Sequence, residues 1–321
     1  MAAERILITG GEWFIGSHLV ERVKQEKPES TIMIIDSHVR TLPENKRKVR
    51  SILGTDDVQH RCNLAGEKAR KIIWEFAPDR IFHLAAQISI VRSFQDPQGT
   101  IQANILAIQN MLDALGDVWK KDTHILFPSS GGSVYGNTHT IPTPEFTGTS
   151  PKSPYAYSKV AGEELLKMYH ELGHIWFLTI LRLSNVYGPR QNTADSASVI
   201  QTAIGKAQKD EPFHLIWDTT NTRDYIHVDD VISAFMMSMN KRVSGTFNIG
   251  TGVETSVDNI LMMVERVSGK TIQRDTSRVW EWKNLLARSC LAIQKAKDRL
   301  WWKPQMTLEQ GIWTVWNELT P

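Results

Sequence analysis

A tyrosine and a lysine stand four positions apart near the middle of the chain, at Tyr155 and Lys159. On an α-helix, residues at this spacing lie on the same face. An ammonium group beside a phenol stabilises the phenolate, which can then take a proton from a substrate hydroxyl. The same spacing is also common where a helix merely buries the tyrosine and exposes the lysine. Ser153 and Pro154 support the helix, because serine followed by proline is typical of a helix start.

Three serines lie upstream of this pair and could hold a substrate oxygen. Ser129, Ser130 and Ser133 follow the apolar run 125–127, which predicts a buried strand. Hydroxyl groups at the carboxyl end of such a strand lie where open parallel sheets bind their ligands. The sequence therefore predicts a proton-transfer site made from Tyr155 and Lys159 with one of these hydroxyls.

A second candidate site begins with the glycine-rich turn at residues 9–16. A strand, a glycine turn and an immediate helix place backbone N–H groups and the positive helix end against a pyrophosphate. Gly10 would form the tight turn, and Gly16 would let the helix pack close to the sheet. Asp36 ends the next strand, where a carboxylate accepts bonds from the adenosine ribose and repels a 2′-phosphate. The pattern predicts a dinucleotide site that favours NAD over NADP.

Trp13 departs from this pattern. Glycine at that position would let the pyrophosphate approach the backbone, whereas an indole either fills the same space or points away from it. The first alternative predicts a weakened NAD site, and the second leaves the site open.

Short apolar runs alternate with amphipathic stretches through the first 184 residues. The apolar runs predict buried parallel strands at 6–8, 32–35, 81–82, 125–127 and 178–181. The amphipathic stretches predict helices at 15–24, 65–76, 100–115 and 155–172. This alternation predicts an α/β fold, a Rossmann-type doubly wound parallel sheet with a smaller interleaved C-terminal substrate domain. We expect an NAD-binding domain at 1–184, completed by 223–250, and a substrate domain at 185–222 and 251–321.

The composition narrows the partners and the compartment. Lysine plus arginine total 37 and aspartate plus glutamate total 35, a net charge of +2 without a basic run, so we expect no nucleic-acid partner. The two cysteines, Cys62 and Cys290, are too few for a disulfide framework or a zinc cluster, and we expect no metal. No apolar stretch is long enough for a signal peptide or a membrane span. These features favour a cytoplasmic protein without a membrane partner.

Many motifs together resemble the extended short-chain dehydrogenases/reductases, in the group of NAD-dependent nucleotide-sugar epimerases and dehydratases. Within that group the chain is most similar to 4-epimerases of UDP-glucose and UDP-N-acetylglucosamine. The matching segments are residues 9–20, 83–87 with Ser93 and Pro97, Asn104, 134–136, 153–159, 181–190, 223–230, 247–250 and 302–304.

The resemblance implies a reaction and a role for individual residues. It implies epimerisation at C4 of a UDP-sugar through a 4-keto sugar, with Tyr155 as the acid–base group and Lys159 on the nicotinamide ribose. The cofactor-binding set would be Gly10, Trp13, Phe14, Ile15, Gly16, Asp36, Asn63, Leu64, Leu84, Ala85, Ala86, Asn104, Ser129, Tyr155 and Lys159. The substrate-binding set would be Gln87, Asn185, Arg223, Arg278 and Ser289. Relatives pair through a four-helix bundle, so the resemblance also implies a homodimer, here through helices 100–115 and 155–172.

Several positions depart from the family pattern. Gly131 stands where the family has a serine or threonine, so either Ser130 or Ser133 substitutes for it or the role is missing. Gly132 and Ser133 replace the Asp-Glu of the 4,6-dehydratases, which argues against elimination chemistry. One alignment keeps Arg278 as the second phosphate arginine, while a gapless one places Trp282 in that block and Ser289 where a bulky residue would restrict the sugar. Tryptophan or threonine also replaces glycine at Trp217, Thr219 and Trp301. The alternatives are thus an impaired or silent nucleotide-sugar-binding protein, or a nucleotide-sugar reductase or dehydratase.

Overall fold

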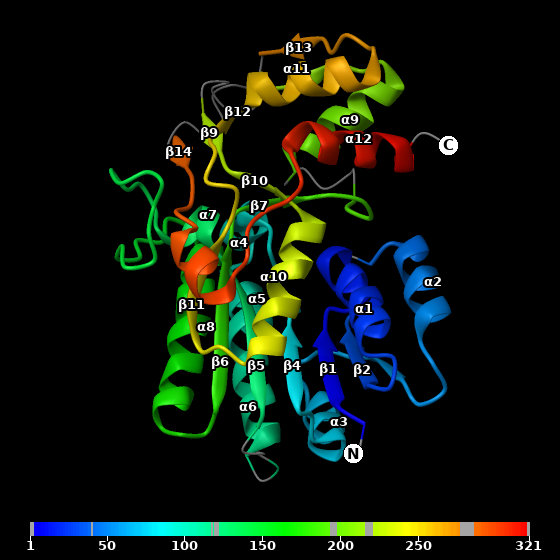
Figure 1. Cartoon of the computed structure of the whole chain (residues 1–321), viewed down its shortest axis with the longest axis vertical. Helices are drawn as coiled ribbons and strands as arrows, with labels where there is room; N and C mark the ends of the chain where they lie inside the picture. Colours follow the sequence, from blue (N-terminus) through cyan, green and yellow to red (C-terminus); the bar gives the residue numbers. More distant parts are fainter. Residues whose placement is uncertain are drawn as a thin grey trace. The chain divides into compact units, whose positions relative to one another are not determined.

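The computed structural model describes residues 3–39, 41–116, 118, 122–192, 198–215, 221–276 and 286–319. The chain forms two units, each continuous in space but not in sequence (Figure 1). The first contains residues 1–130, 151–182 and 232–247, and the second contains residues 131–150, 183–231 and 248–321. The functional domain boundaries expected from the sequence stay a prediction.

The first unit is built on a sheet of seven strands in the order β11-β6-β5-β4-β1-β2-β3. Its strands are β1 (Arg5–Thr9), β2 (Thr31–Asp36), β3 (Val58–Arg61), β4 (Arg80–His83), β5 (His124–Ser130), β6 (Phe177–Leu183) and β11 (Gly245–Ile249). The pairs β3–β2, β2–β1, β1–β4 and β4–β5 are parallel. The predicted doubly wound fold class is confirmed.

All five predicted strands lie inside strands of this sheet. Their side chains are buried because helices cover both faces of a parallel sheet. The edge strand β3 was not predicted, and its sequence Val-Gln-His-Arg explains why. An edge strand is half solvated, so it needs no continuous apolar run.

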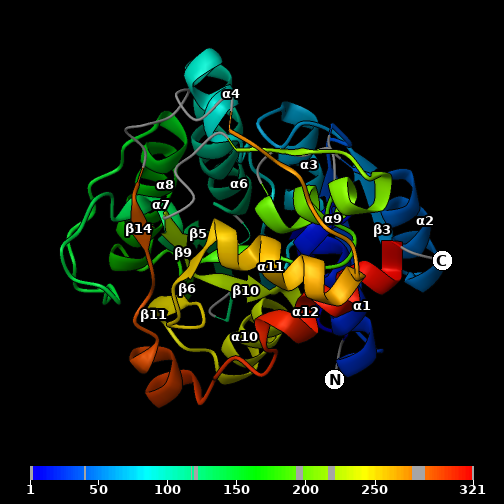
Figure 2. The same cartoon turned by 90° about the horizontal axis from the view of Figure 1, so that it is seen from above.

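Helices flank the sheet on both sides, with α3, α6 and α8 on one face and α1 and α10 on the other (Figure 2). Their bounds are α1 (Phe14–Glu26), α2 (Pro43–Ile52), α3 (Glu67–Phe76), α4 (Ile90–Gln95), α5 (Pro97–Ile101), α6 (Ala107–Leu115), α8 (Pro154–Glu171) and α10 (Val228–Lys241). Ser153 caps α8 as predicted, because its hydroxyl accepts a bond from the Ala156 N–H at 3.1 Å.

The predicted helix 100–115 is interrupted by a π-helical turn, η1 (Gln102–Leu106), between α5 and α6. On an unbroken helix the apolar residues 101, 105, 108 and 112 would share one face, which could serve the expected dimer. The wider turn rotates the residues that follow it, so these four side chains do not stay on one face. Ile101 is exposed, whereas Ile108 and Leu112 are buried in the core against the sheet. Ile108 and Leu112 therefore belong to the core and are not available to a dimer interface.

The second unit has a small helical core formed by α9 (Val199–Lys209), α11 (Val257–Ser268) and α12 (Leu308–Leu319). Short strand pairs accompany it, namely β10 (Tyr225–His227) with β7 (Asn185–Tyr187), and β13 (Arg274–Asp275) with β8 (Phe213–His214). A three-stranded sheet has the order β12 (Thr255–Ser256), β9 (Thr222–Arg223), β14 (Arg288–Ser289). The helical turns α7 (Gly131–Val134) and η2 (Ala296–Leu300) complete it. In the described part of the chain, no helix combines the length and the apolar character that crossing a bilayer requires.

Candidate active site

The order of the strands places the predicted cofactor residues at one edge of the first unit. The chain adds β2 and β3 on one side of β1 and then adds β4 and the later strands on its other side, so the strand order reverses between β1 and β4. Ligands of open parallel sheets bind beyond the carboxyl ends of strands at such a point. Hydrogen bonds join the two strand ends: the Ala85 N–H donates to Thr9 Oγ1 at 3.1 Å, and the Leu84 N–H donates to the Thr9 carbonyl at 3.2 Å.

The glycine turn after β1 is tight for steric reasons that the structure makes visible. Gly10 has φ +70°, and a Cβ there would lie 3.0 Å from the Ala85 nitrogen. A Cβ on Gly16 would overlap the Gly10 carbonyl oxygen. Both glycines are therefore required where α1 approaches β1, as the sequence predicted.

Trp13 occupies the N-cap of α1 with φ −91° and ψ 179°. Any residue adopts this extended backbone, so the turn does not itself demand glycine at this position. The indole meets the Phe14 ring edge-on at 6.3 Å between ring centroids. Backbone strain therefore gives no reason for glycine at this position.

Asp36 ends β2 as predicted and is buried. Its carboxylate accepts bonds from the Glu12 N–H at 3.2 Å, the His38 N–H at 2.8 Å and the Thr41 hydroxyl at 3.2 Å. Asp36 thus holds the glycine turn to the loop that follows β2.

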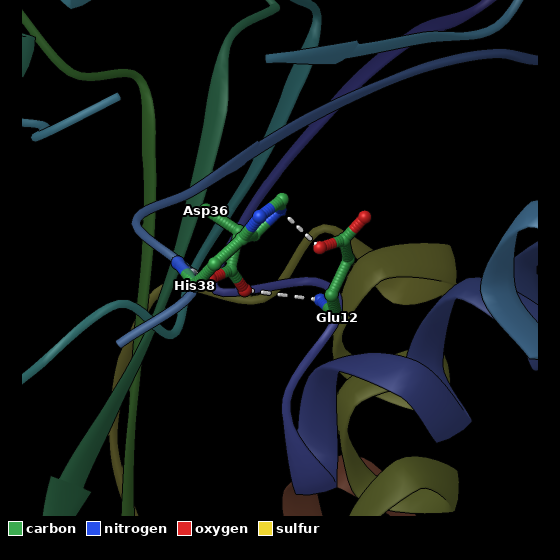
Figure 3. Close-up of side chains that lie close together, drawn as sticks. All are labelled: Glu12, Asp36 and His38. Atoms are coloured by element: carbon green, nitrogen blue, oxygen red, sulfur yellow. Dashed lines mark hydrogen bonds and ion pairs between the residues drawn. The ribbon is translucent and has the colours of Figure 1, made fainter. Parts of the chain in front are cut away.

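Glu12 and His38 were missed by the sequence analysis, and Figure 3 shows them beside Asp36. The His38 ring contacts the Glu12 carboxylate, and both side chains are largely buried. Burial and the nearby Asp36 raise the pKa of Glu12, while Lys46 and Arg50 oppose that shift. The positive φ of His38, +61°, turns its ring back toward Glu12, and this loop geometry carries no signal in the sequence.

The donor atoms of Glu12, Asp36 and His38 all lie within 4.8 Å of one another, a spacing that could hold a cation. Other partners already engage them, however. The Lys46 ammonium lies 3.2 Å from His38 Nδ1, and backbone N–H groups bond both oxygens of Asp36. We assign no metal to this cluster.

Lys159 is buried on α8, and its ammonium donates to the Pro128 carbonyl at 2.9 Å. It also lies 4.8 Å from the centroid of the Phe127 ring, a cation–π contact. Burial lowers the pKa of Lys159 to about 8, although Glu163 one turn further along the helix opposes the shift. Glu163 is itself held by Arg182, whose Nη2 lies 2.6 Å from its Oε2. The ammonium of Lys159 is therefore held in place, and it loses its proton at a lower pH than an exposed lysine does.

Tyr155 lies in the first turn of α8, and its carbonyl accepts a bond from the Ser158 hydroxyl at 2.8 Å. Ser129 and Ser130 end β5 in the same unit. The Ser129 hydroxyl is buried and has no hydrogen-bond partner among the described residues. Buried polar groups are rarely left in this state, so an external partner for Ser129 is expected.

Asn104 and Gln87 are engaged with each other. The Asn104 side chain bonds both the N–H and the carbonyl of Gln87, at 2.7 and 2.8 Å, and also donates to the Ser158 hydroxyl at 2.8 Å. The Gln87 side chain donates to Thr100 Oγ1 at 3.1 Å. This network fixes the loop after β4 against α8, so both residues position the site in this structure.

The remaining predicted cofactor residues follow the carboxyl ends of β1, β3 and β4. They are buried or half-buried, except for the exposed Asn63, and comprise Phe14, Ile15, Asn63, Leu64, Leu84, Ala85 and Ala86.

Asn185 begins β7 in the second unit, and its N–H donates to the Asp224 carbonyl at 2.9 Å. A Cβ on Gly132 would lie 2.9 Å from Asn185 Oδ1. The glycine that replaces an acidic residue of the dehydratases therefore makes room for this side chain. Ser133, the next residue, lies buried in α7.

Arg223 and Ser289 are register partners on β9 and β14, so the structure brings these two predicted substrate residues together. The Arg223 guanidinium donates to the carbonyls of Leu286, at 2.6 Å, and Ala287, at 3.2 Å. Arg278, Trp217, Thr219 and Trp282 lie outside the described residues.

Two family-matching motifs of the second unit act as structural clamps. The Asp230 carboxylate accepts bonds from the N–H groups of Gln305, at 2.8 Å, and Met306, at 3.1 Å, while the Trp302 indole donates to the Asp230 carbonyl at 3.0 Å. The buried Asp224 carboxylate accepts from the Thr251 N–H at 2.8 Å. These residues hold the C-terminal segment in place.

The residues of the first unit fit a dinucleotide. The glycine turn packs closely between the ends of β1 and β4, Asp36 ends β2 with a carboxylate, and the buried Ser129 hydroxyl has no hydrogen-bond partner among the described residues. Together with the Tyr155–Lys159 helix, this arrangement defines the class of extended short-chain dehydrogenases/reductases.

The comparisons agree with this class. Residues 7–315 match the family described as GDP-mannose 4,6 dehydratase. A UDP-glucose 4-epimerase of Mycolicibacterium smegmatis is 34% identical over 314 residues, which cover 96% of each chain. The chain therefore belongs to this family of nucleotide-sugar epimerases and dehydratases, and the predicted resemblance is confirmed.

Two solved structures show how closely the fold is shared. A UDP-glucose 4-epimerase of Thermotoga maritima with UDP-glucose superimposes with a TM-score of 0.89 at 29% identity over 98% of both chains. A UDP-glucose 4-epimerase of Thermus thermophilus in complex with NAD gives 0.88 at 29% identity, again over 98% of both.

Proposed function

We propose that this protein is an NAD-dependent 4-epimerase of UDP-sugars. The observation that carries the proposal is the buried Lys159 ammonium on the helix of Tyr155, fixed by the Pro128 carbonyl. The M. smegmatis relative is a UDP-glucose 4-epimerase, and the two solved relatives hold UDP-glucose and NAD. Bound NAD would supply reversible oxidation of sugar carbon 4, so that the 4-keto sugar can be reduced on either face.

The residues from β5 to α8 supply proton transfer and orientation. Tyr155 takes the proton of the sugar 4-hydroxyl and later returns it. Lys159 stabilises the phenolate and binds the nicotinamide ribose, because its buried charge has few competing water contacts. Ser129 lies at the strand end where the cofactor is held, and Ser130 or Ser133 supplies the hydroxyl that Gly131 cannot.

The residues of the second unit bind the nucleotide-sugar. Asn185 and Arg223 contact the diphosphate; a guanidinium has five N–H groups, so its bonds to carbonyls leave donors for phosphate oxygens. Ser289, beside Arg223, is small and leaves room for an N-acetyl group on the sugar. Gly132 favours epimerisation over 4,6-dehydration, because it lacks the carboxylate that the dehydratases use for elimination.

The decisive experiment replaces Tyr155 by phenylalanine and measures the interconversion of UDP-glucose and UDP-galactose. Losing the acid–base group should lower turnover about 10²-fold or more. Tyr157→Phe is the matched control, because Tyr157 lies on the same helix but is exposed. Near-normal turnover by Tyr155→Phe would show that another residue transfers the proton. A wild-type protein that releases NAD on denaturation yet epimerises no UDP-sugar would instead be a binding protein.

A homodimer is part of the proposal. Exposed apolar side chains lie on α5, η1 and α8 of the first unit: Ile101, Leu106, Tyr157 and Met168. Two copies of this face would form a four-helix bundle. Light scattering at micromolar concentration should give the dimer mass, and Leu106→Glu should give the monomer mass.

A cytoplasmic location is proposed on the state of the cysteines. Cys62 and Cys290 are both free thiols. Free thiols persist in a reducing compartment. Fractionation of expressing cells would test the location.

A further inference from the structure

Two buried carboxylates face the loop that follows β2. Glu12 and Asp36 are 1% and 7% exposed, and their ligand oxygens lie within 4.8 Å of each other (Figure 3). Each carboxylate oxygen of Asp36 accepts a hydrogen bond from a backbone N–H group, one from Glu12 and one from His38. Glu12, in contrast, turns its carboxylate toward a side chain, the imidazole of His38.

Lys46 determines how His38 meets Glu12. The Lys46 ammonium, which can only donate, lies 3.2 Å from His38 Nδ1, so this nitrogen must accept. A neutral His38 therefore carries its proton on Nε2, the nitrogen that faces the Glu12 carboxylate. Burial and Lys46 lower the pKa of His38, which favours this neutral form.

Cations surround this pair. Lys46 and Arg50 extend from α2, and Arg61 ends β3; all three act electrostatically on His38. Such a group of cations would attract a phosphate at the end of β2, where the 2′-position of an adenosine ribose belongs. Asp36 alone leaves this attraction only partly balanced.

We propose that Glu12 is a second selectivity carboxylate, which together with Asp36 rejects a dinucleotide bearing a 2′-phosphate. The inference rests on the proposed NAD-dependent function. Glu12 acts by its charge, and His38 is a positioning residue that holds the Glu12 carboxylate beside Asp36.

The test measures the dissociation constants of NAD and NADP by isothermal titration at pH 8, for the wild type and Glu12→Gln. Glutamine retains the shape and one side-chain oxygen, but it lacks the charge. We expect the ratio of Kd(NADP) to Kd(NAD) to fall at least about tenfold in Glu12→Gln, a change of ~1.4 kcal/mol. The fall should come from tighter NADP binding, with Kd(NAD) changing less than about threefold.

Glu21→Gln is the matched control, because it makes the same chemical change on the following helix, where Glu21 pairs with Lys48. It should leave the ratio unchanged. His38→Ala should lower the ratio in the wild-type background but not in Glu12→Ala, since His38 acts through Glu12.

Several outcomes would overturn the inference. If both constants in Glu12→Gln change by the same factor, Glu12 has a structural role only. If neither constant changes, its charge is not felt at the ribose. A wild-type protein that binds neither nucleotide would refute the proposed function itself, whereas tight NAD binding with an unchanged ratio would refute this inference alone.

Discussion

Trp13 and Trp301 both stand where the family pattern expects glycine, yet the two positions differ in kind. Trp13, in the first unit, has an extended backbone with φ −91°. Trp301, in the second, has the left-handed conformation with φ +58° and ψ +31°, and its side chain is 77% exposed. Only the second position strains a residue that has a Cβ.

The difference shows that glycine is expected at these positions for separate reasons. At the turn after β1 it leaves space for a ligand, and at the end of η2 it satisfies the backbone. A tryptophan at position 13 therefore leaves the backbone unstrained, while a tryptophan at position 301 strains it. Variants of residues that stabilise the fold should change the free energy of unfolding, whereas variants of residues that bind the ligand should change its affinity.

The largest effect is expected at the neighbour of Trp301. Trp302 is buried, and its indole donates to the Asp230 carbonyl at 3.0 Å. Trp302→Ala should lower the free energy of unfolding by about 3–5 kcal/mol, as expected for a buried aromatic side chain. Chemical denaturation measures it, with the exposed Trp301→Ala as control. Equal losses in the two variants would contradict the assignment of Trp302 as a clamp.

Lys159 should show the reverse behaviour, because its burial serves the ligand. Its folded-state pKa of about 8 lies below the ordinary 10.5 of lysine. The unfolded chain binds more protons between these values, so this group makes the protein more stable as pH rises from about 8 to 10.5. At pH 7 the penalty is about 3 kcal/mol.

Lys159→Met should therefore raise the unfolding free energy at pH 7 by about 1–3 kcal/mol, less whatever the lost bond to Pro128 contributed. The gain should shrink as pH rises toward 10.5. Denaturation of both proteins at pH 7, 8.5 and 10 measures the difference. A variant less stable than the wild type at pH 7 would show that the charge is well solvated.

The sequence predicts those helices and strands in which apolar residues follow a regular pattern. The five buried strands and the α8 start were found because their residues repeat a simple pattern. Helix α2 was missed because its sequence, Pro-Glu-Asn-Lys-Arg-Lys-Val-Arg-Ser-Ile, buries only Asn45 and Val49. The π-helical turn was missed because its extra residue leaves no mark on composition.

The sequence predicts site residues that a local motif identifies one by one. It does not predict those whose role depends on a contact with a residue distant in the sequence. Gly10, Gly16 and Asp36 follow from a strand–turn–helix pattern. The Glu12–His38 contact joins residues 26 positions apart through a loop with a positive φ, which no local pattern reveals. Asp230 and Trp302 both match the family pattern, but only the structure shows that they are joined by a hydrogen bond.

Trp13→Gly tests the ligand side of the comparison. If the indole occupies the pyrophosphate space, each displaced charge-assisted bond loses on the order of 1.5–3 kcal/mol. The variant should then bind NAD at least about tenfold more tightly by isothermal titration. Its unfolding free energy should not rise, because the backbone at Trp13 is unstrained. Equal affinity would mean that the indole points away from the cofactor.

Trp301→Gly tests the backbone side, with the smallest expected effect. A residue with a Cβ in the left-handed region is less stable than glycine there by about 1 kcal/mol. Trp301→Gly should therefore be about 1 kcal/mol more stable than Trp301→Ala, because both lose the indole and only glycine relieves the strain. For a chain of this size the difference appears as roughly 2–4 °C in Tm. Affinity for NAD should be the same in both, in contrast to Trp13→Gly. If alanine and glycine at position 301 prove equally stable, the left-handed conformation at the end of η2 is not the reason that the family expects glycine there.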